Sequence, residues 1–150
     1  EVEGNVLLLD GVQDPGNMGT IIRSAVAFGV NTIVLGEGSV SIYNPKVVRA
    51  TEGLLFHINI IEASIENMIL ELQKEGYTTY SSKVDGGTNI ADIEFSKKSA
   101  IVVGNEGKGV RQSTSDLCDE YLYIPMRETC ESLNVGVATS IILYELSKKI

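Results

Sequence analysis

Residues that build metal centres and covalent cross-links are scarce in this sequence, which has two cysteines and one histidine among 150 residues. Cys118 and Cys130 are too few for a disulfide framework, and they do not form a Cys-x-x-Cys pair. Their spacing from His57 fits no zinc finger or zinc ribbon. We therefore expect these three residues to be structural, no metal to be bound, and the protein to work in a reducing, cytoplasmic setting.

Long apolar runs and a charged-then-apolar leader are also absent, so the sequence predicts no membrane span and no secretion signal. Basic residues are in deficit, because 12 Lys and Arg stand against 20 Asp and Glu, for a formal net charge of −8. A protein with this charge is not expected to coat nucleic acid nonspecifically, although a local basic site is compatible with it. The length of 150 residues and the 43% of apolar residues predict one ordinary globular domain.

Apolar runs of strand length alternate with helical patterns along the chain. The predicted strands are 5–10, 32–35, 57–61, 77–81, 99–104 and 121–124. The predicted helices are 17–28, a short one opened by Pro45, one from Ser64 to Gly76, 109–117 and 133–148, and Asp85, Gly86 and Gly87 form a flexible polar loop. Because the strands are continuously apolar, we expect an α/β fold with a mostly parallel sheet of about six strands and helices on both faces.

The predicted C-terminal helix is apolar around most of its circumference. Val137, Ile141 and Tyr144 add to an apolar set that leaves little polar surface before Lys148. Such a helix needs cover on more than one side. In so small a domain one face can meet the sheet and another a second subunit, so we predict a homodimer.

Three polar loops follow predicted strands, where open parallel sheets bind their ligands. The first loop, 10–19, has glycines spaced as in a phosphate-binding loop, but Asn17 and Met18 stand where Lys and Ser or Thr are needed. A dinucleotide fingerprint fails too, since no Gly-x-Gly-x-x-Gly lies between strand and helix. The loop brings Asn17 and Arg23 near one helix end. Alternatively, Asn17 is a helix cap and Arg23 a surface residue.

The second loop, 103–109, contains three glycines that permit positive φ and close approach of the backbone to a ligand. Glu106 lies among them. Its carboxylate would repel phosphates, so it fits a ligand that offers hydroxyls or positive charge. The alternative is a plain glycine-rich turn.

The third loop starts where Pro125 ends the sixth strand, and it leads into the C-terminal helix. Glu131, Ser132 and Asn134 cluster at the start of that helix. Ser and Asn are good caps, so capping alone explains them as well as a binding site does.

The three loops carry the motifs Asn17-x-Gly19-x-Ile21-x-Arg23, Asn105-Glu106-Gly107-x-Gly109, and Ile124-Pro125-Met126 followed by Glu131-Ser132-Leu133-Asn134-Val135. Together they resemble the signature motifs of SpoU/TrmH-type methyltransferases in the SPOUT superfamily, in the same order. The segment Pro45-Lys46-Val47-Val48-Arg49-Ala50 is also common in that family. Two departures are Gly136, where many members carry Ser, and Cys130, which matches no motif position.

The resemblance implies methyl transfer from S-adenosylmethionine to a ribose 2′-hydroxyl in structured RNA, with ribosomal RNA favoured by the long form of the third motif. It also implies a catalytic domain over residues 1–150, a deep C-terminal trefoil knot and a homodimer. Many relatives also carry an N-terminal RNA-binding domain, and we expect any such domain to lie outside residues 1–150. The alternatives are transfer to tRNA, transfer to a base, or a non-catalytic module that binds S-adenosylmethionine or RNA.

The resemblance further assigns residues to roles. Cofactor contacts fall on Gly104, Ile124 and Leu133, mainly through the backbone, with Ser82, Gly107 and Met126 nearby. The catalytic candidates are Arg23, Asn17, Glu106, Ser132 and Asn134.

Arg23 is the candidate with the most direct role in the chemistry. An arginine has been proposed as the base in this family, yet a guanidinium is effectively always charged in proteins. We therefore expect Arg23 to bind the phosphate beside the target ribose and to stabilise developing negative charge. Glu106 and Asn134 are expected to orient the reacting groups.

Overall fold

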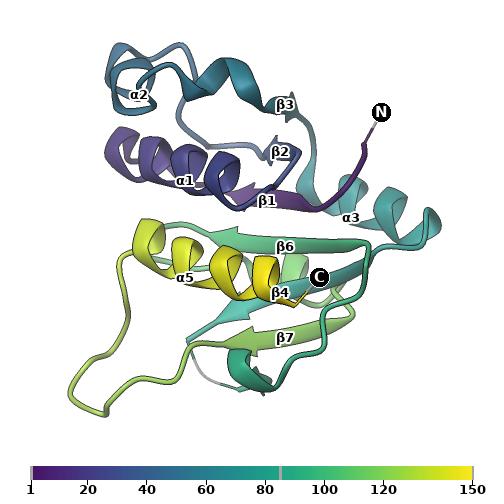
Figure 1. Cartoon of the computed structure of the whole chain (residues 1–150). Coiled ribbons are helices and arrows are strands. Elements are labelled where there is room, and N and C mark those ends of the chain that lie inside the picture. Colours follow the sequence, from purple (N-terminus) through teal and green to yellow (C-terminus); the bar gives the residue numbers. More distant parts are fainter. Residues whose placement is uncertain (1, 85, 150) are drawn as a thin grey trace.

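A parallel sheet lies at the centre of the molecule. The computed structural model describes residues 2–84 and 86–149, so Asp85 of the predicted flexible loop lies outside the described residues. Within them the strand order is β3-β2-β1-β6-β4-β7-β5, and every strand pairing is parallel. The strands are β1 (Val6–Asp10), β2 (Thr32–Leu35), β3 (Asn59–Glu62), β4 (Thr78–Lys83), β5 (Thr88–Asn89), β6 (Ser99–Gly104) and β7 (Glu120–Tyr123) (Figure 1).

Helices cover both faces of this sheet, as the continuous apolar strands predicted. Leu7 and Leu9 of β1 point to one face, where they join a core with α1 (Pro15–Ala27) and α5 (Val135–Lys148). Val6 and Leu8 point to the other face and join a core with α3 (Ile65–Lys74). Both faces of β1 are therefore buried, which accounts for its lack of polar alternation.

The remaining helical segments are short: α2 (Pro45–Ala50), η1 (Leu54–His57), η2 (Ile90–Asp92) and α4 (Gln112–Ser115). The predicted helix 109–117 is thus only α4, which follows Arg111 without a side-chain cap. The predicted third strand starts later, at Asn59, because His57 ends η1. Strand β5 was missed, since two residues after a polar glycine loop carry no periodic signal.

The helices α1 and α5, which flank the site, each start two residues away from the predicted position. Asp14 caps α1 by accepting a hydrogen bond from the backbone N–H of Asn17, so the helix starts at Pro15 and Asn17 is not the cap. Asn134 caps α5 by accepting from the N–H of Val137. The cap predicted at the start of the C-terminal helix is therefore confirmed, and the helix begins at Val135 rather than Leu133.

Helices α1 and α5 lie side by side across the sheet (Figure 1). The Ser24 and Ser140 hydroxyls form a hydrogen bond of 2.6 Å between them. On its other side α1 packs against α2, where a Cβ on Gly19 would lie 2.3 Å from the Cβ of Ala50. Only glycine allows this approach, so the glycine of the first motif has a packing role.

Parallel strands place their carboxyl ends at one edge of the sheet. In the order β1-β6-β4-β7, this edge brings together the three loops that the sequence singled out. No helix in the described part of the chain is long and apolar enough to cross a membrane. The knotted path of the C-terminal segment stays a prediction.

Candidate functional site

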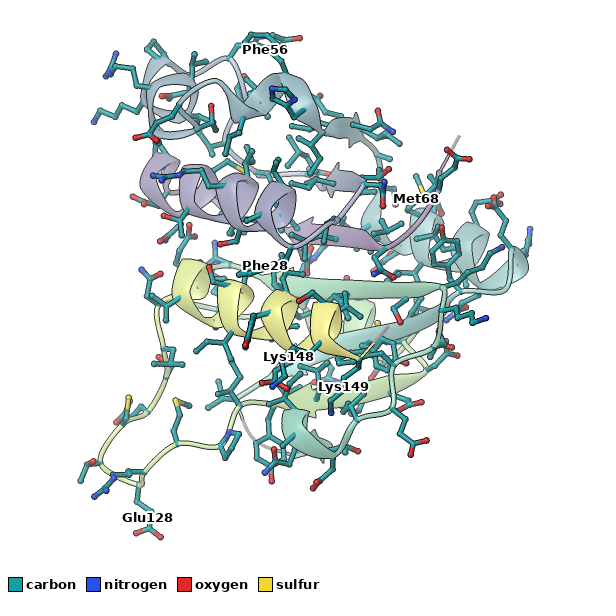
Figure 2. The ribbon with its side chains drawn as sticks, in the orientation of Figure 1. Phe28, Phe56, Met68, Glu128, Lys148 and Lys149 are labelled. Atoms are coloured by element: carbon teal, nitrogen blue, oxygen red, sulfur yellow. The ribbon has the colours of Figure 1, made fainter. Side chains whose placement is uncertain are left out.

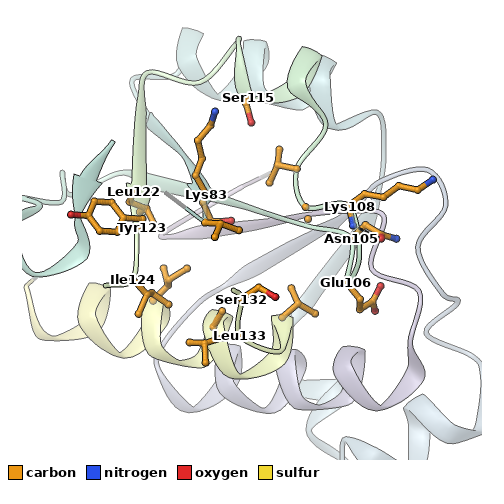
Figure 3. Close-up of a pocket in the computed structure, with 18 of the residues that line it drawn as sticks. Lys83, Asn105, Glu106, Lys108, Ser115, Leu122, Tyr123, Ile124, Ser132 and Leu133 are labelled. Carbon is orange, nitrogen blue, oxygen red and sulfur yellow. Dashed lines mark hydrogen bonds between the residues drawn. The ribbon is translucent and has the colours of Figure 1, made fainter. Parts of the chain in front are cut away.

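A cavity of about 370 Å³ opens at the carboxyl ends of β4, β6 and β7. Apolar side chains from Leu122 and Ile142 form part of its wall, and the glycine-rich second loop closes one end. Figure 3 shows Ile124, Ser132 and Leu133 on the side of α5, and Asn105 and Lys108 at the end formed by the second loop. All six residues assigned to the cofactor by resemblance line this cavity, namely Ser82, Gly104, Gly107, Ile124, Met126 and Leu133.

The second loop folds back on itself in a tight turn. Asn105 and Gly109 exchange backbone hydrogen bonds of 3.1 and 2.9 Å, and Gly109 has a φ of +71°. A Cβ on Gly104 would lie 2.1 Å from the carbonyl carbon of Gly109. Glycine is therefore required at 104 by close approach and favoured at 109 by its φ. The turn exposes backbone groups to the cavity.

The side chain of Asn105 organises the same turn from within. Its oxygen accepts hydrogen bonds from the N–H groups of Gly107 and Lys108, at 2.8 and 3.0 Å. Its amide nitrogen donates to the carbonyl of Gly11, at 2.9 Å. The second loop is thereby tied to the first.

Glu106 forms the next tie between these loops. Its carboxylate accepts hydrogen bonds from the N–H of Asp14 at 2.7 Å and from the N–H of Gln13 at 3.0 and 3.1 Å. The side-chain amide of Asn17 donates to it at 3.4 Å. The carboxylate is thus held by the start of α1, where free N–H groups favour negative charge.

The ionisation of Glu106 reflects these contacts. Partial burial acts to raise the pKa of its carboxyl group, but the hydrogen bonds from Asp14, Gln13 and Asn17, and from its own N–H, outweigh that effect and lower the pKa below its ordinary value. Glu106 is therefore anionic at neutral pH. It acts here as a hydrogen-bond acceptor that fixes the first loop.

The third loop joins the network through Asn134. Its side-chain nitrogen donates to the side-chain oxygen of Asn17 at 2.9 Å, while its oxygen caps α5. A continuous path of hydrogen bonds therefore runs from Glu106 through Asn17 to Asn134. Ser132 lines the cavity two residues earlier. The structure thus joins three of the five catalytic candidates by hydrogen bonds, and a fourth, Ser132, lines the cavity.

Arg23, the fifth candidate, lies apart from this network. Its guanidinium pairs with the carboxylate of Glu52 at 3.5 Å, and both side chains are more than half exposed. It does not line the cavity. Arg23 is on α1, six residues and less than two turns beyond Asn17, so its side chain leaves the helix on a different turn.

The loop between β7 and α5 extends away from the body of the protein, with Glu128 at its outer end (Figure 2). Its residues 127–132 are exposed. Cys130 in this loop is a free thiol that contacts the carbonyl of Ser132 at 3.3 Å. The other thiol, Cys118, is half-buried, and burial raises its pKa to about 12. It is therefore protonated at neutral pH and inert, as a structural residue should be.

Sequence reasoning missed two residues beside the site. Asp10 ends β1 with its side chain almost fully buried, and Arg111 follows the second loop; they form an ion pair of 3.0 Å. The sequence did carry a signal for this pair, because Asp10 is a charged residue at the end of a buried apolar strand. A buried carboxylate needs a partner of opposite charge or a hydrogen-bond donor. Among the described residues no group of three or more His, Cys, Asp or Glu side chains is placed to hold a metal ion.

The sequence and the fold of this chain are similar to those of known RNA methyltransferases. Residues 4–144 match the model of the SpoU rRNA Methylase family. The chain is 41% identical over 141 residues to the 23S rRNA (guanosine(2553)-2′-O)-methyltransferase RlmP of Bacillus subtilis, a match that covers 94% of this chain and 57% of that protein. The chain therefore spans little more than half the length of this relative.

Two solved structures show the same fold. The AdoMet-bound rRNA methyltransferase from Sinorhizobium meliloti superposes with a TM-score of 0.92 at 31% identity, over 100% of this chain and 58% of that one. The SpoU methyltransferase AviRb from Streptomyces viridochromogenes, in complex with AdoMet, gives a TM-score of 0.89 at 28% identity, over 96% of this chain and 59% of that one. With its parallel α/β fold, its three motif loops at one edge of the sheet and a family match over nearly its whole length, this chain belongs to the SpoU rRNA methylase family.

Proposed function

We propose that this chain transfers the methyl group of S-adenosylmethionine to a ribose 2′-hydroxyl of ribosomal RNA. The observation that carries the proposal is the hydrogen-bonded path from Glu106 through Asn17 to Asn134 at one end of the cavity. This path joins the three family motifs beside the cavity that we assign to the cofactor. A non-catalytic module has no need to keep this set of polar groups together.

The cavity fits the cofactor in size and character. Its volume of about 370 Å³ lies in the usual range for small-molecule sites. Apolar cover from Ile124 and Leu133 suits an adenine ring, whereas the backbone of Gly104 and Gly107 offers hydrogen bonds to polar edges. Lys83 and Lys108 also line the cavity and suit a carboxylate. When bound, S-adenosylmethionine supplies an electrophilic methyl group.

The residues of this chain orient the reaction. Methyl transfer needs the hydroxyl in line with the methyl carbon, so a rigid frame around the site contributes directly to rate. Glu106 and Asn134 hold Asn17 from two sides, and we assign Asn17 and Ser132 as the polar side chains that meet an incoming ribose. Arg23 must leave Glu52 to bind a substrate phosphate and to stabilise negative charge.

Ribosomal RNA is favoured as the substrate because the relative from Bacillus subtilis is named for a guanosine of 23S rRNA. A guanosine ribose in the large ribosomal RNA is therefore the first target to examine. Such a substrate places the protein in the cytoplasm, in line with the expectation from its cysteine content.

A homodimer is the second part of the proposal. Val137 and Tyr144 on α5 are each about half exposed, and α5 lies beside α1. Tyr144 packs edge-on against Phe28, with ring centroids 5.6 Å apart, and Figure 2 shows Phe28 between these helices. These side chains form an apolar surface on the face turned away from the sheet. A second copy of the chain would cover it.

The decisive experiment compares RNA from cells with and without the protein by nuclease digestion and mass spectrometry. Loss of one 2′-O-methylated nucleotide from ribosomal RNA, restored by the wild-type gene, is expected. Loss from tRNA would move the substrate to the alternative class, and loss of a base methyl group would contradict ribose chemistry. If RNA methylation is unchanged and the purified protein does not bind S-adenosylhomocysteine, the proposed methyl transfer is wrong and the chain is a non-catalytic module.

A further inference from the structure

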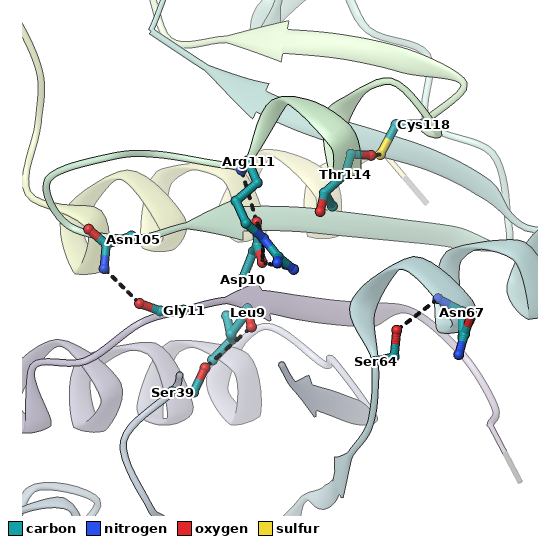
Figure 4. A network of polar contacts seen from close by, with 10 residues as sticks. All are labelled: Leu9, Asp10, Gly11, Ser39, Ser64, Asn67, Asn105, Arg111, Thr114 and Cys118. Carbon is teal, nitrogen blue, oxygen red and sulfur yellow. Dashed lines mark hydrogen bonds and ion pairs between the residues drawn. The ribbon is translucent and has the colours of Figure 1, made fainter. Parts of the chain in front are cut away.

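The buried carboxylate of Asp10 contacts Arg111, the residue that follows the second loop by two positions. The side chain of Asp10 is only 2% exposed, at the carboxyl end of β1. Its Oδ2 accepts a hydrogen bond from the backbone N–H of Arg111 at 2.9 Å, and its Oδ1 accepts from Nε of Arg111 at 3.0 Å. Nη2 of Arg111 lies 3.0 Å from the same Oδ1. Figure 4 shows the guanidinium lying against this carboxylate.

These contacts suit Arg111 and not a generic cation. A buried carboxylate is stable only when it is paired and hydrogen-bonded. The guanidinium presents a planar set of donors in a fixed geometry, which a lysine ammonium does not reproduce. The backbone N–H of Arg111 adds a third donor, so both the side chain and the main chain of Arg111 are fixed.

The position of Arg111 in the chain gives this pair its importance. The loop 104–109 lines the cavity, and so do Val110 and Gln112 on either side of Arg111. Arg111 itself does not line it. It therefore holds the far end of the loop without touching the ligand site.

The near end of the same loop is held by the neighbour of Asp10. The side-chain amide of Asn105 donates to the carbonyl of Gly11 at 2.9 Å (Figure 4). Consecutive residues at the end of β1 thus anchor both ends of the loop. Gly104 and Gly109 are close enough between these anchors that no Cβ fits on Gly104. The loop is a closed, pre-formed turn rather than a free segment.

We propose that Asp10 and Arg111 are positioning residues for the cofactor, because their ion pair holds the glycine-rich loop 104–109 in the shape that binds it. The identity of the ligand rests on the proposed function, whereas the effect on the loop does not. Pre-organisation of a binding loop raises affinity by removing the cost of ordering it on binding.

Two conservative variants test the pair. Arg111→Lys keeps the positive charge but loses the planar set of donors, and Asp10→Asn keeps the shape but loses the negative charge. Each should weaken the affinity for S-adenosylhomocysteine, measured by isothermal titration calorimetry, by about tenfold. The double variant should lose little more than either single variant, because both act through one contact. Lys74→Ala, which removes an exposed ion pair with Glu71 on α3, is the control and should bind as the wild type does.

A measurement on the loop itself separates positioning from general stability. In the ligand-free protein, Arg111→Lys should speed amide hydrogen exchange at Gly107 and Lys108 while leaving Leu8 in β1 as protected as in the wild type. Equal loss of protection at all three positions would show a merely structural pair and overturn the proposal. Affinities of both single variants within twofold of the wild type would overturn it as well.

Failure of the proposed function gives a different pattern. If the wild type does not bind S-adenosylhomocysteine, the cofactor assignment is wrong, and hydrogen exchange alone decides the loop's role. Faster exchange confined to Gly107 and Lys108 would then still support Asp10 and Arg111 as positioning residues, and unchanged exchange would refute them.

Discussion

Asn134 donates a hydrogen bond of 2.9 Å from its side-chain amide to the side-chain oxygen of Asn17, 117 positions earlier in the chain. The same Asn134 side chain caps α5 through its oxygen. One residue therefore starts the C-terminal helix and joins the third motif to the first. These two roles can be separated by mutation.

Asn134→Ser should separate capping from the contact with Asn17. Serine caps helices about as well as asparagine, so urea denaturation should show stability within about 0.5 kcal/mol of the wild type. Its hydroxyl is too short to reach Asn17, so methyl transfer should fall by tenfold or more, on the order of the loss of one orienting contact. Asn134→Ala should lose this activity and also about 1 kcal/mol of stability. Full activity in the serine variant would contradict the orienting role.

Arg23→Lys should reduce kcat/KM for RNA by about tenfold or more, because an ammonium cannot form the paired hydrogen bonds of a guanidinium with a phosphate. Steady-state assays with a radiolabelled methyl donor measure this loss. Arg49→Lys on α2 is a matched exposed control and should stay within about twofold of the wild type. Full turnover in Arg23→Lys would rule out recognition of a phosphate by two hydrogen bonds.

Gly104→Ala should prevent the second loop from closing. The added Cβ would lie 2.1 Å from the carbonyl carbon of Gly109, which is backbone and cannot turn aside. Overpacking of this kind costs about 1–3 kcal/mol or forces the loop to move. Thermal unfolding and binding of S-adenosylhomocysteine should both be impaired.

Gly107→Ala is the control for this loop. The nearest atom to an added Cβ there is the Asn105 side-chain oxygen at 3.7 Å, an ordinary contact, so stability should change little. An equal loss of stability in the two alanine variants would show that tightness at Gly104 is not the cause.

The ionisation of Glu106 should make stability depend on pH in the acid range. Its pKa is lowered in the folded protein from the ordinary 4.5, so the folded state binds fewer protons and is favoured as pH rises. This contribution is complete above about pH 4.5 and is lost as pH falls below that value through the lower pKa of the folded state. Urea denaturation between pH 3 and pH 7 measures the free energy of unfolding. As pH falls, this free energy should decrease less steeply in Glu106→Gln than in the wild type. The same pH dependence of unfolding in both proteins would contradict a stabilising role for ionised Glu106.

Val137→Glu should produce a monomer if α5 lies in a dimer interface. Val137 is 47% exposed on α5, and a buried unpaired carboxylate is costly at an interface. Leu70→Glu on α3 is a close match, since Leu70 is 45% exposed on the opposite face of the sheet. Analytical ultracentrifugation at micromolar concentration should return a dimer for the wild type and for Leu70→Glu. A monomeric wild type would remove the homodimer proposal.

Local patterns predicted most of the fold. Continuous apolar runs such as Leu7–Leu9 indicated buried parallel strands, because a strand covered on both faces has no need for alternation. The cap at Asn134 and the tight glycine turn at 104–109 also follow from residue type. Strand β5 did not, since two residues are too few for a periodic signal. The helix α1 was predicted to start at Asn17, but it starts at Pro15, and Asp14 before Pro15 was the available signal.

The sequence by itself determined the parallel α/β class and the three motif loops, because each depends on neighbours along the chain, and the family resemblance named six residues that lie among those lining the cavity. Only the tertiary structure decided which side chains meet. The order β1-β6-β4-β7 brings loops from distant positions to one edge, and this places Asn17 between Glu106 and Asn134 and Asp10 against Arg111. It also pairs Arg23 with Glu52, away from the cavity. Such contacts depend on strand order and on the facing of single side chains, which no local pattern encodes.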